Sequence, residues 1–316
     1  MSSTRPLKQA FSTMAWSVDT AQSSPTPLGF VADTDRVLVN GHPLTIPWSQ
    51  YRGAIGLSDS GLLNGLGVEL LNTENVARQP VQWFSQPSLT PLILATWLTQ
   101  RHRYLDITSF SHAAGWRIEV NGDTLRLDTP TAEVTGIRQG RQSWGDRLVI
   151  DLDRPTPWRI VGNSNEFTVM IDARAGQALR SIASRRGEYL AGFRFEQSAN
   201  QTLLRLQTSG GIQPHGWTLP NPTRLVIDLR PDALVQRNIV WAPGIRWQQQ
   251  FLSLAGDRFP VVWLEIDPRH AELALQPITA NSTGAVGTAP LLTMAPQAGA
   301  IAAINGGFFN RNNRLP

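Results

Sequence analysis

Alternation of apolar and polar residues is clearest in two stretches that are each interrupted by an Asn-Gly pair. The first runs over 37–46 around Asn40-Gly41, and the second runs over 117–127 around Asn121-Gly122. Alternation with a period of two places every second side chain on one face, and Asn-Gly suits the two residues of a tight turn. The pattern therefore predicts two β-hairpins.

Helical patterns are short. We expect one helix over 62–71 and a second over 91–100, with Thr90 as the cap of the second and a proline as its first residue. A third helix is expected over 288–297, capped by the threonine at its start, with Gly299 just beyond its end.

Between residues 134 and 233, short apolar strands alternate with turns and the pattern repeats. The strands are 148–152, 167–172, 203–206 and 224–229. The second pair matches the first at a period of 55 to 56 residues. An offset of 77 residues, which lays 147–151 on 224–228, matches more letters but spans only one strand. We expect two units of paired strands, each too small to bury its own apolar face.

The pattern changes near residue 239. The run 259–268 is almost continuously apolar, as in a strand covered on both faces. A Ser/Thr/Gly loop over 279–288, the third helix and a strand over 300–304 follow it. This order indicates the beginning of an α/β domain.

Composition supports a globular, turn-rich and mainly β protein. Hydrophobic residues make up 41% and charged residues 16% of the 316 residues, with 26 Gly and 22 Pro. The 11 Trp residues favour packed β layers or sugar-stacking surfaces, and core packing is the commoner use. There is no cysteine, which excludes disulfides and thiol nucleophiles. We also expect no transmembrane segment, because no apolar run approaches about 18 residues.

The cationic residues are almost all arginines. Lys8 is the only lysine, and the net charge is +4 with a sequence pI near 10.2. Arginine binds carboxylate or phosphate with two hydrogen bonds, so an anionic cell-wall polymer or phosphodiester is one explanation. A biased genome composition explains the same fact. The arginines are dispersed, so we expect no nucleic-acid partner, although salt-sensitive binding to one is a third hypothesis.

Two N-terminal regions resemble modules of bacterial envelope proteins. The segment Asn221-Pro222-Thr223-Arg224-Leu225-Val226-Ile227-Asp228-Leu229 resembles the AMIN domain, which implies a β-sandwich over 134–233. The two Asn-Gly hairpins are similar to the β-rich domain named after copper amine oxidase, which would occupy 34–133 without oxidase activity. Residues 1–33 are Ser/Thr/Pro-rich and are expected to form a flexible leader.

The C-terminal part resembles the phosphodiester glycosidase family. The resemblance covers 239–316 and rests on Trp241-Ala242-Pro243-Gly244-Ile245-Arg246-Trp247, Glu265-Ile266-Asp267-Pro268 and Ala303-Ile304-Asn305-Gly306-Gly307-Phe308-Phe309-Asn310. This family includes the N-acetylglucosamine-1-phosphodiester alpha-N-acetylglucosaminidases. The resemblance implies hydrolysis of a sugar-1-phosphodiester bond in the envelope or periplasm, although no signal peptide is evident at the N-terminus.

The Asn-Gly-Gly-Phe-Phe element suits such a substrate. Two glycines allow successive N–H groups to converge on an anion, and Asn305 would offer an amide to a sugar hydroxyl or phosphate oxygen. An aromatic ring would form a wall for the sugar, and Arg311 would bind phosphate. The expected substrate-binding residues are Gly306, Gly307, Phe308, Phe309, Asn310 and Arg311.

Glycosidic cleavage normally uses carboxyl groups as acid and as base or nucleophile. No Asp or Glu follows Glu272, so Glu265 and Asp267, two residues apart on the expected strand, join Asn305 as catalytic candidates. A strand end at which Asp-Pro starts a turn is the stronger explanation of the two carboxylates. We expect the domain to continue beyond Pro316, and the chain to lack part of its active site.

The sequence indicates no metal ion or other cofactor. The five histidines are dispersed and are expected at the surface. The predicted fold is therefore mainly β, with the AMIN-like sandwich followed by the first part of an α/β glycosidase-like domain. The predicted function is envelope phosphodiester glycosidase acting on a glycan or sugar-phosphodiester substrate. The alternative is a non-catalytic protein that binds polysaccharide, with peptidoglycan as a further partner, through its β-rich modules.

Overall fold

The computed structural model describes residues 15–19, 34–86, 92–99, 101–163, 165–177, 179, 182–209, 211–231, 233–280 and 289–305. These residues form five β-sheets and three α-helices, so the prediction of a mainly β protein is confirmed. The chain divides into two compact units. The larger unit holds the described residues between 34 and 97 and between 103 and 265, and the rest belong to the smaller unit.

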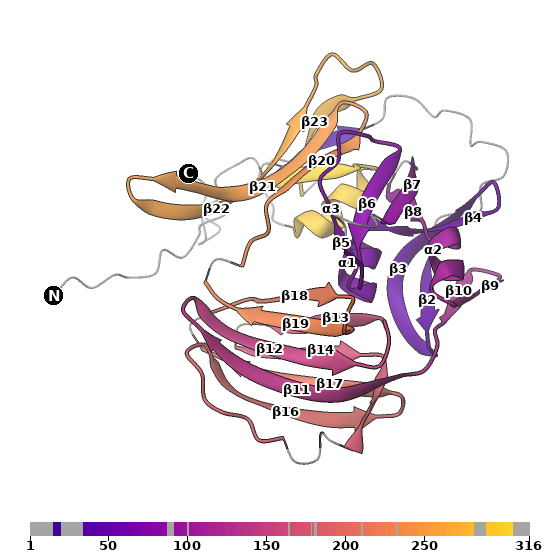
Figure 1. Cartoon of the computed structure of the whole chain (residues 1–316). Helices are drawn as coiled ribbons and strands as arrows, with labels where there is room; N and C mark the ends of the chain where they lie inside the picture. The colour runs from indigo at the N-terminus through magenta and orange to yellow at the C-terminus, as the bar shows by residue number, and fades with distance from the viewer. Residues whose placement is uncertain are drawn as a thin grey trace. The chain divides into compact units, whose positions relative to one another are not determined.

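The first sheet of the larger unit has nine strands in the order β5-β6-β7-β8-β4-β3-β2-β10-β9 (Figure 1). Its strands are β2 (Thr34–Val39), β3 (His42–Tyr51), β4 (Ala54–Ser58), β5 (Glu69–Leu70), β6 (Arg78–Gln82), β7 (Leu92–Leu98), β8 (Arg103–Asp106), β9 (Arg117–Asn121) and β10 (Thr124–Asp128). Both predicted hairpins are confirmed as the antiparallel pairs β2–β3 and β9–β10. Asn40 and Gly41 have φ of 50° and 83°, the left-handed values that this turn requires.

Two short helices accompany this sheet, α1 (Asp59–Leu66) and α2 (Thr108–Ala113). The helix expected over 62–71 therefore begins and ends earlier. It begins where the Ser58 hydroxyl accepts a hydrogen bond from the backbone N–H of Gly61, and it ends at Gly67 in the left-handed conformation.

The helix expected over 91–100 is wrong, because Leu92–Leu98 is the strand β7. This strand pairs with β6 in antiparallel register, and Trp97 stacks on Tyr104 with ring centroids 5.9 Å apart. Thr90 and Pro91, which suggested a helix start, lie outside the described residues. Residues 92–98 form a strand because they hydrogen-bond between β6 and β8. Ile93, Thr96 and Trp97 all suit a strand.

The region from 132 to 229 forms two further sheets with orders β15-β11-β12-β19-β18 and β13-β14-β17-β16. The strands are β11 (Ala132–Gln142), β12 (Gly145–Leu152), β13 (Trp158–Asn163), β14 (Glu166–Ile171), β15 (Ala173–Ala175), β16 (Leu190–Ser198), β17 (Gln201–Thr208), β18 (Pro214–Leu219) and β19 (Arg224–Leu229). Leu148 and Leu225 of one sheet, and Val169 and Leu204 of the other, are completely buried in one core. The two sheets therefore face each other as a β-sandwich (Figure 1).

The four strands of the predicted repeat are β12, β14, β17 and β19. β12 pairs with β19 in one sheet and β14 pairs with β17 in the other, so each repeat unit contributes one strand to each sheet. The expected pairing within each unit is therefore wrong, because the two strands of a unit lie in different sheets and each pairs with a strand of the other unit.

A three-stranded sheet of β20 (Arg237–Ala242), β21 (Ile245–Leu254) and β22 (Asp257–Ile266) follows the sandwich. The strand expected at 259–268 is present as β22, but it is not covered on both faces. Phe259 is 43% and Val262 is 55% exposed. The apolar run formed the strand, and the tertiary structure left it uncovered.

The smaller unit contains the sheet β23-β1-β24 and the helix α3. Their bounds are β1 (Ala15–Asp19), β23 (Ala274–Ile278), β24 (Ala302–Asn305) and α3 (Leu291–Gln297). Residues 15–19 were expected in a flexible leader, but they pair with two strands more than 250 residues away, which no local pattern reveals. The predicted helix and last strand are confirmed with shifted ends; the expected cap Thr288 lies outside the described residues, and Pro290 occupies the cap position.

Within the described part of the chain, no helix is both long enough and apolar enough to cross a membrane.

Candidate functional site

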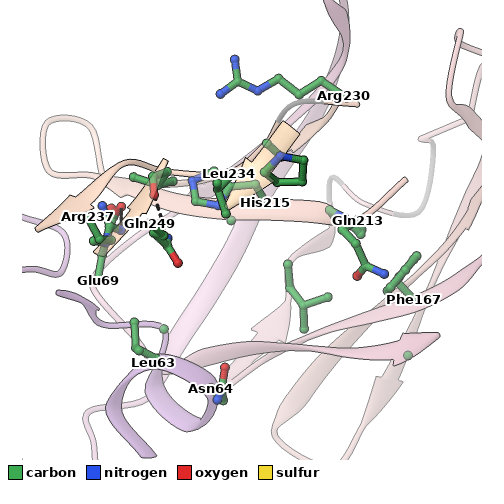
Figure 2. A pocket seen from close by; sticks show the side chains of 18 of the residues that line it. Leu63, Asn64, Glu69, Phe167, Gln213, His215, Arg230, Leu234, Arg237 and Gln249 are labelled. Atoms are coloured by element: carbon green, nitrogen blue, oxygen red, sulfur yellow. Dashed lines mark hydrogen bonds and ion pairs between the residues drawn. The ribbon is translucent and has the colours of Figure 1, made fainter. Parts of the chain in front are cut away.

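A cavity of about 640 Å³ opens in the larger unit. Its walls come from helix α1, the sandwich strands β13, β14 and β18, and the three-stranded sheet β20–β22. This volume lies within the range of about 300–1,000 Å³ that is typical of small-molecule sites. Figure 2 shows the cavity with its labelled side chains.

One wall is a row of three side chains on β21. Trp247, Gln249 and Phe251 all line the cavity and are half-buried. They are two residues apart, so an extended strand presents all three on the same face. The strand is held in place by the β20–β21 hairpin, in which Ile239 is paired with Trp247. The result is an aromatic, amide, aromatic row with rings about 14 Å apart along the strand.

An ion pair forms a second part of the wall. The guanidinium of Arg237, on β20, donates a hydrogen bond of 2.5 Å to the carboxylate of Glu69, on β5. The two side chains are only 9% and 18% exposed, so the pair is largely withdrawn from water. Figure 2 shows Gln249 beside this pair; its amide donates a 2.7 Å hydrogen bond to the carbonyl of Val235.

His215, on β18, also lines the cavity. Burial lowers the pKa of its imidazole, while Glu69 and Asp228 raise it and Arg237 and Arg230 lower it. The first of these effects is the largest, so the imidazole is held in its neutral form. As a neutral ring it can donate one hydrogen bond and accept another.

Two exposed amides complete the polar lining. Asn64 projects from α1, and Gln213 precedes β18; both are labelled in Figure 2. The cavity also touches two buried rings, Trp158 and Phe167, which belong to the sandwich core. Amides, a neutral imidazole and half-buried aromatic rings together form the chemistry that binds polyhydroxylated ligands: hydrogen bonds around the edge and apolar contact across the face.

The predicted site residues do not line this cavity. Glu265, on β22, is exposed and accepts a 3.0 Å hydrogen bond from the amide of Gln248. Strand β22 ends at Ile266, so Asp267 is not on the strand as expected; its carboxylate accepts a 3.0 Å bond from the backbone N–H of Arg269 in the following turn.

Asn305 is the exposed last residue of β24. The remaining predicted substrate-binding residues, Gly306, Gly307, Phe308, Phe309, Asn310 and Arg311, lie outside the described residues. Asn305 and Asp267 belong to the smaller unit and Glu265 to the larger one, and the catalytic assignments stay predictions.

The histidines were expected at the surface, and for His215 this is wrong, because it is half-buried in the cavity wall. Among the described residues, no group of three or more His, Asp or Glu side chains is placed to hold a metal ion.

Sequence reasoning missed this site because its walls come from segments far apart in the chain. The only local signal was the alternation of Trp247, Gln249 and Phe251. That pattern indicates a strand with two aromatic rings and an amide on one face, but it does not show which other segments lie opposite that face.

No protein-family model matches the chain, and no curated protein sequence matches it. The chain is similar to the crystal structure of a hypothetical protein from Synechocystis, with 36% sequence identity and a TM-score of 0.77. The match covers 91% of this chain and 51% of that protein, so the chain spans about half the length of its structural relative.

Proposed function

We propose that this chain is the saccharide-binding part of a longer phosphodiester glycosidase of the bacterial cell envelope or periplasm. In this proposal the cavity of the larger unit binds the glycan, and hydrolysis of a sugar-1-phosphodiester bond belongs to a domain that begins near residue 239. The finer division into an AMIN-like sandwich and an α/β glycosidase-like domain is part of the same proposal.

The observation that carries the binding function is the row of Trp247, Gln249 and Phe251 on the cavity wall. A half-buried aromatic ring offers a flat apolar surface to a sugar face, and the amide between the rings offers hydrogen bonds to hydroxyl groups. The spacing of the rings is long enough for more than one sugar unit. An oligosaccharide therefore fits this wall better than a monosaccharide does.

The hydrolytic function is supported by the family resemblance and by the position of Asn305. Asn305 is an exposed residue of β24, and in the sequence it directly precedes the Gly-Gly pair on which the resemblance rests.

Binding is tested with the 316-residue chain and a panel of wall and exopolysaccharide oligosaccharides, followed by tryptophan fluorescence and calorimetry. We expect Trp247→Ala to weaken binding by about tenfold or more, because one aromatic contact contributes about 1.5 kcal/mol. Trp263→Ala is the matched control: Trp263 is equally half-buried on the neighbouring strand but does not line the cavity. Absence of saccharide binding, or equal losses in both variants, would contradict the proposal.

Hydrolysis is tested separately, with a longer form of the protein and an aryl sugar-1-phosphodiester. We expect sugar release that Asn305→Ala abolishes. Saccharide binding without any hydrolysis would favour the second candidate, a non-catalytic polysaccharide-binding protein, for which the same cavity is the supporting observation.

A further inference from the structure

The ion pair in the cavity wall leaves one carboxylate oxygen of Glu69 without a partner. Arg237 donates its hydrogen bond to Oε1 of Glu69, and none of the residues that the structure describes donates to Oε2. An ionised carboxylate accepts hydrogen bonds through both oxygens, and an acceptor that stays unpaired away from water is costly. Glu69 lines the cavity and its side chain is 18% exposed, so Oε2 is available to a donor on a ligand there.

Arg237 fixes this carboxylate and compensates its charge. Besides the 2.5 Å bond to Glu69, its guanidinium donates a 3.2 Å hydrogen bond to the carbonyl of Gln236, next to the start of β20. Because the carboxylate already has a cation beside it, Oε2 does not require a cationic ligand. A neutral donor such as a hydroxyl group is sufficient, and it binds a carboxylate more strongly than it binds a neutral acceptor.

His215 is a second polar group of the cavity that hydrogen-bonds to no described residue through its ring. Burial lowers its pKa and the charges of Glu69, Asp228, Arg237 and Arg230 act on it, but no hydrogen bond contributes. The neutral ring therefore keeps one donor and one acceptor nitrogen for a ligand. Because the charges of Glu69 and Arg237 both reach the ring, His215 lies near the ion pair in the cavity (Figure 2).

The ion pair lies beside the middle of the aromatic row. Arg237 of β20 is directly paired with Gln249 of β21, and directly paired residues of antiparallel strands point to the same side of the sheet. Trp247 and Phe251 flank Gln249 on that face. A sugar whose apolar face packs on an aromatic ring extends its hydroxyl groups sideways from the contact, where they can bond to Glu69.

We propose that Glu69 and His215 determine the specificity of the cavity by binding two hydroxyl groups of the saccharide. Oε2 of Glu69 accepts a hydrogen bond from one hydroxyl, and the ring of His215 bonds to another. This rests on the proposed saccharide-binding function and adds the residues that recognise the ligand and the groups that they recognise.

The test uses the 316-residue chain and calorimetry. The ligands are neutral trisaccharides of N-acetylglucosamine, of glucose and of galactose, each compared with analogues that lack a single hydroxyl. For at least one trisaccharide, we expect the loss of one particular hydroxyl to weaken binding by about 10- to 100-fold, as a hydrogen bond to a charged group predicts. If a trisaccharide binds and all its analogues bind within about threefold of it, this proposal is overturned and the saccharide function stands. If no trisaccharide binds, the saccharide function itself is overturned.

Glu69→Gln should reduce the penalty for the missing hydroxyl by about tenfold, because a neutral acceptor binds a hydroxyl more weakly than a carboxylate does. Glu74→Gln is the matched control. Glu74 is also paired with an arginine, Arg246, at 2.6 Å, but its side chain is 71% exposed and does not line the cavity. An unchanged penalty in Glu69→Gln, or an equal reduction in Glu74→Gln, contradicts the proposal.

A second readout does not depend on the folding of the Glu69 variant. In the unmodified chain, the ring titration of His215, followed by NMR, should move to lower pH when the trisaccharide binds, because a hydroxyl that donates to the neutral ring favours this form. A titration that stays in place or moves to higher pH at saturation would place the saccharide away from His215 and overturn the proposal.

Discussion

The guanidinium of Arg147 and the carboxylate of Asp228 form two hydrogen bonds of 2.6 and 2.9 Å across neighbouring strands. The strands β12 and β19 carry the same six residues, Arg-Leu-Val-Ile-Asp-Leu, and they pair antiparallel so that the arginine of one faces the aspartate of the other. The indole N–H of Trp217 also donates to Asp228 at 3.1 Å. The register between the identical segments is thus fixed by a charge pair.

Asp151 and Arg224, the corresponding pair at the other end of the two identical segments, do not form this ion pair. Asp151 faces Arg224 in the same register, but its carboxylate is bound instead by Arg138 of β11. The Arg138–Asp151 pair is exposed by 61% and 27%, whereas the Arg147–Asp228 pair is exposed by only 30% and 7%. One sheet therefore contains a partly buried and an exposed version of the same bidentate pair.

This difference predicts unequal effects of the same substitution. Arg147→Met leaves the buried carboxylate of Asp228 without its cation and should lower the free energy of unfolding by about 3 kcal/mol. Arg138→Met removes a pair that water already screens and should cost less than about 1 kcal/mol. Both are measured by urea denaturation. Equal losses would mean that burial does not determine the contribution of these pairs.

The buried carboxylate of Asp172 predicts a pH dependence of stability. Burial raises its pKa above 3.8, although hydrogen bonds from Gln201 and Asn40 act in the opposite direction. A raised pKa in the folded state means that the associated stability is present at low pH and is lost as pH rises from 3.8 through the folded-state pKa.

The stability of the Asp172→Asn variant should therefore increase relative to that of the unmodified chain as pH rises. The measurement is the free energy of unfolding at several pH values. Asp35→Asn, at an exposed aspartate, is the control. A difference that stays constant with pH would contradict the assignment.

His215 predicts a pH dependence of the opposite sign. Its pKa in the folded state is lowered from 6.5, chiefly by burial, so the unfolded chain binds a proton more readily. Stability should be lost as pH falls below 6.5. His215→Gln should lose less stability than the unmodified chain between about pH 7 and about pH 5.

The control for this prediction is His112→Gln, at an exposed histidine of α2. If His215→Gln and His112→Gln lose the same free energy of unfolding between about pH 7 and about pH 5, the loss of stability at low pH does not come from the cavity histidine.

Gly67 tests how closely α1 and the sandwich pack at the cavity. It has φ of +69°, and a Cβ atom there would lie 2.2 Å from the indole of Trp158. Gly67→Ala should cost about 3 kcal/mol, the sum of a left-handed backbone and an overpacked neighbour. Gly53→Ala has the backbone cost alone, because nothing lies within 4 Å of its Cβ position, and should cost about 1–2 kcal/mol. Thermal denaturation of both variants measures the difference.

Local sequence was informative wherever a turn and its strands are neighbours in the chain. Asn40-Gly41 predicted its hairpin correctly because the two partners are separated by the turn alone. It did not show that the side chain of Asn40 also binds Asp172, 132 residues later. Leu92–Leu98 became a strand through β6 and β8, and its own residues contained a plausible helix start.

The sequence by itself determined the mainly β class, the hairpins and the repeated strands of the sandwich, because these follow from period-two patterning and turn chemistry. The tertiary structure decided which faces are covered, which arginines pair with which carboxylates, and where the cavity opens. The physical reason is that the cavity walls come from residues 63 to 260, and contacts over such separations leave no periodic trace in the local sequence.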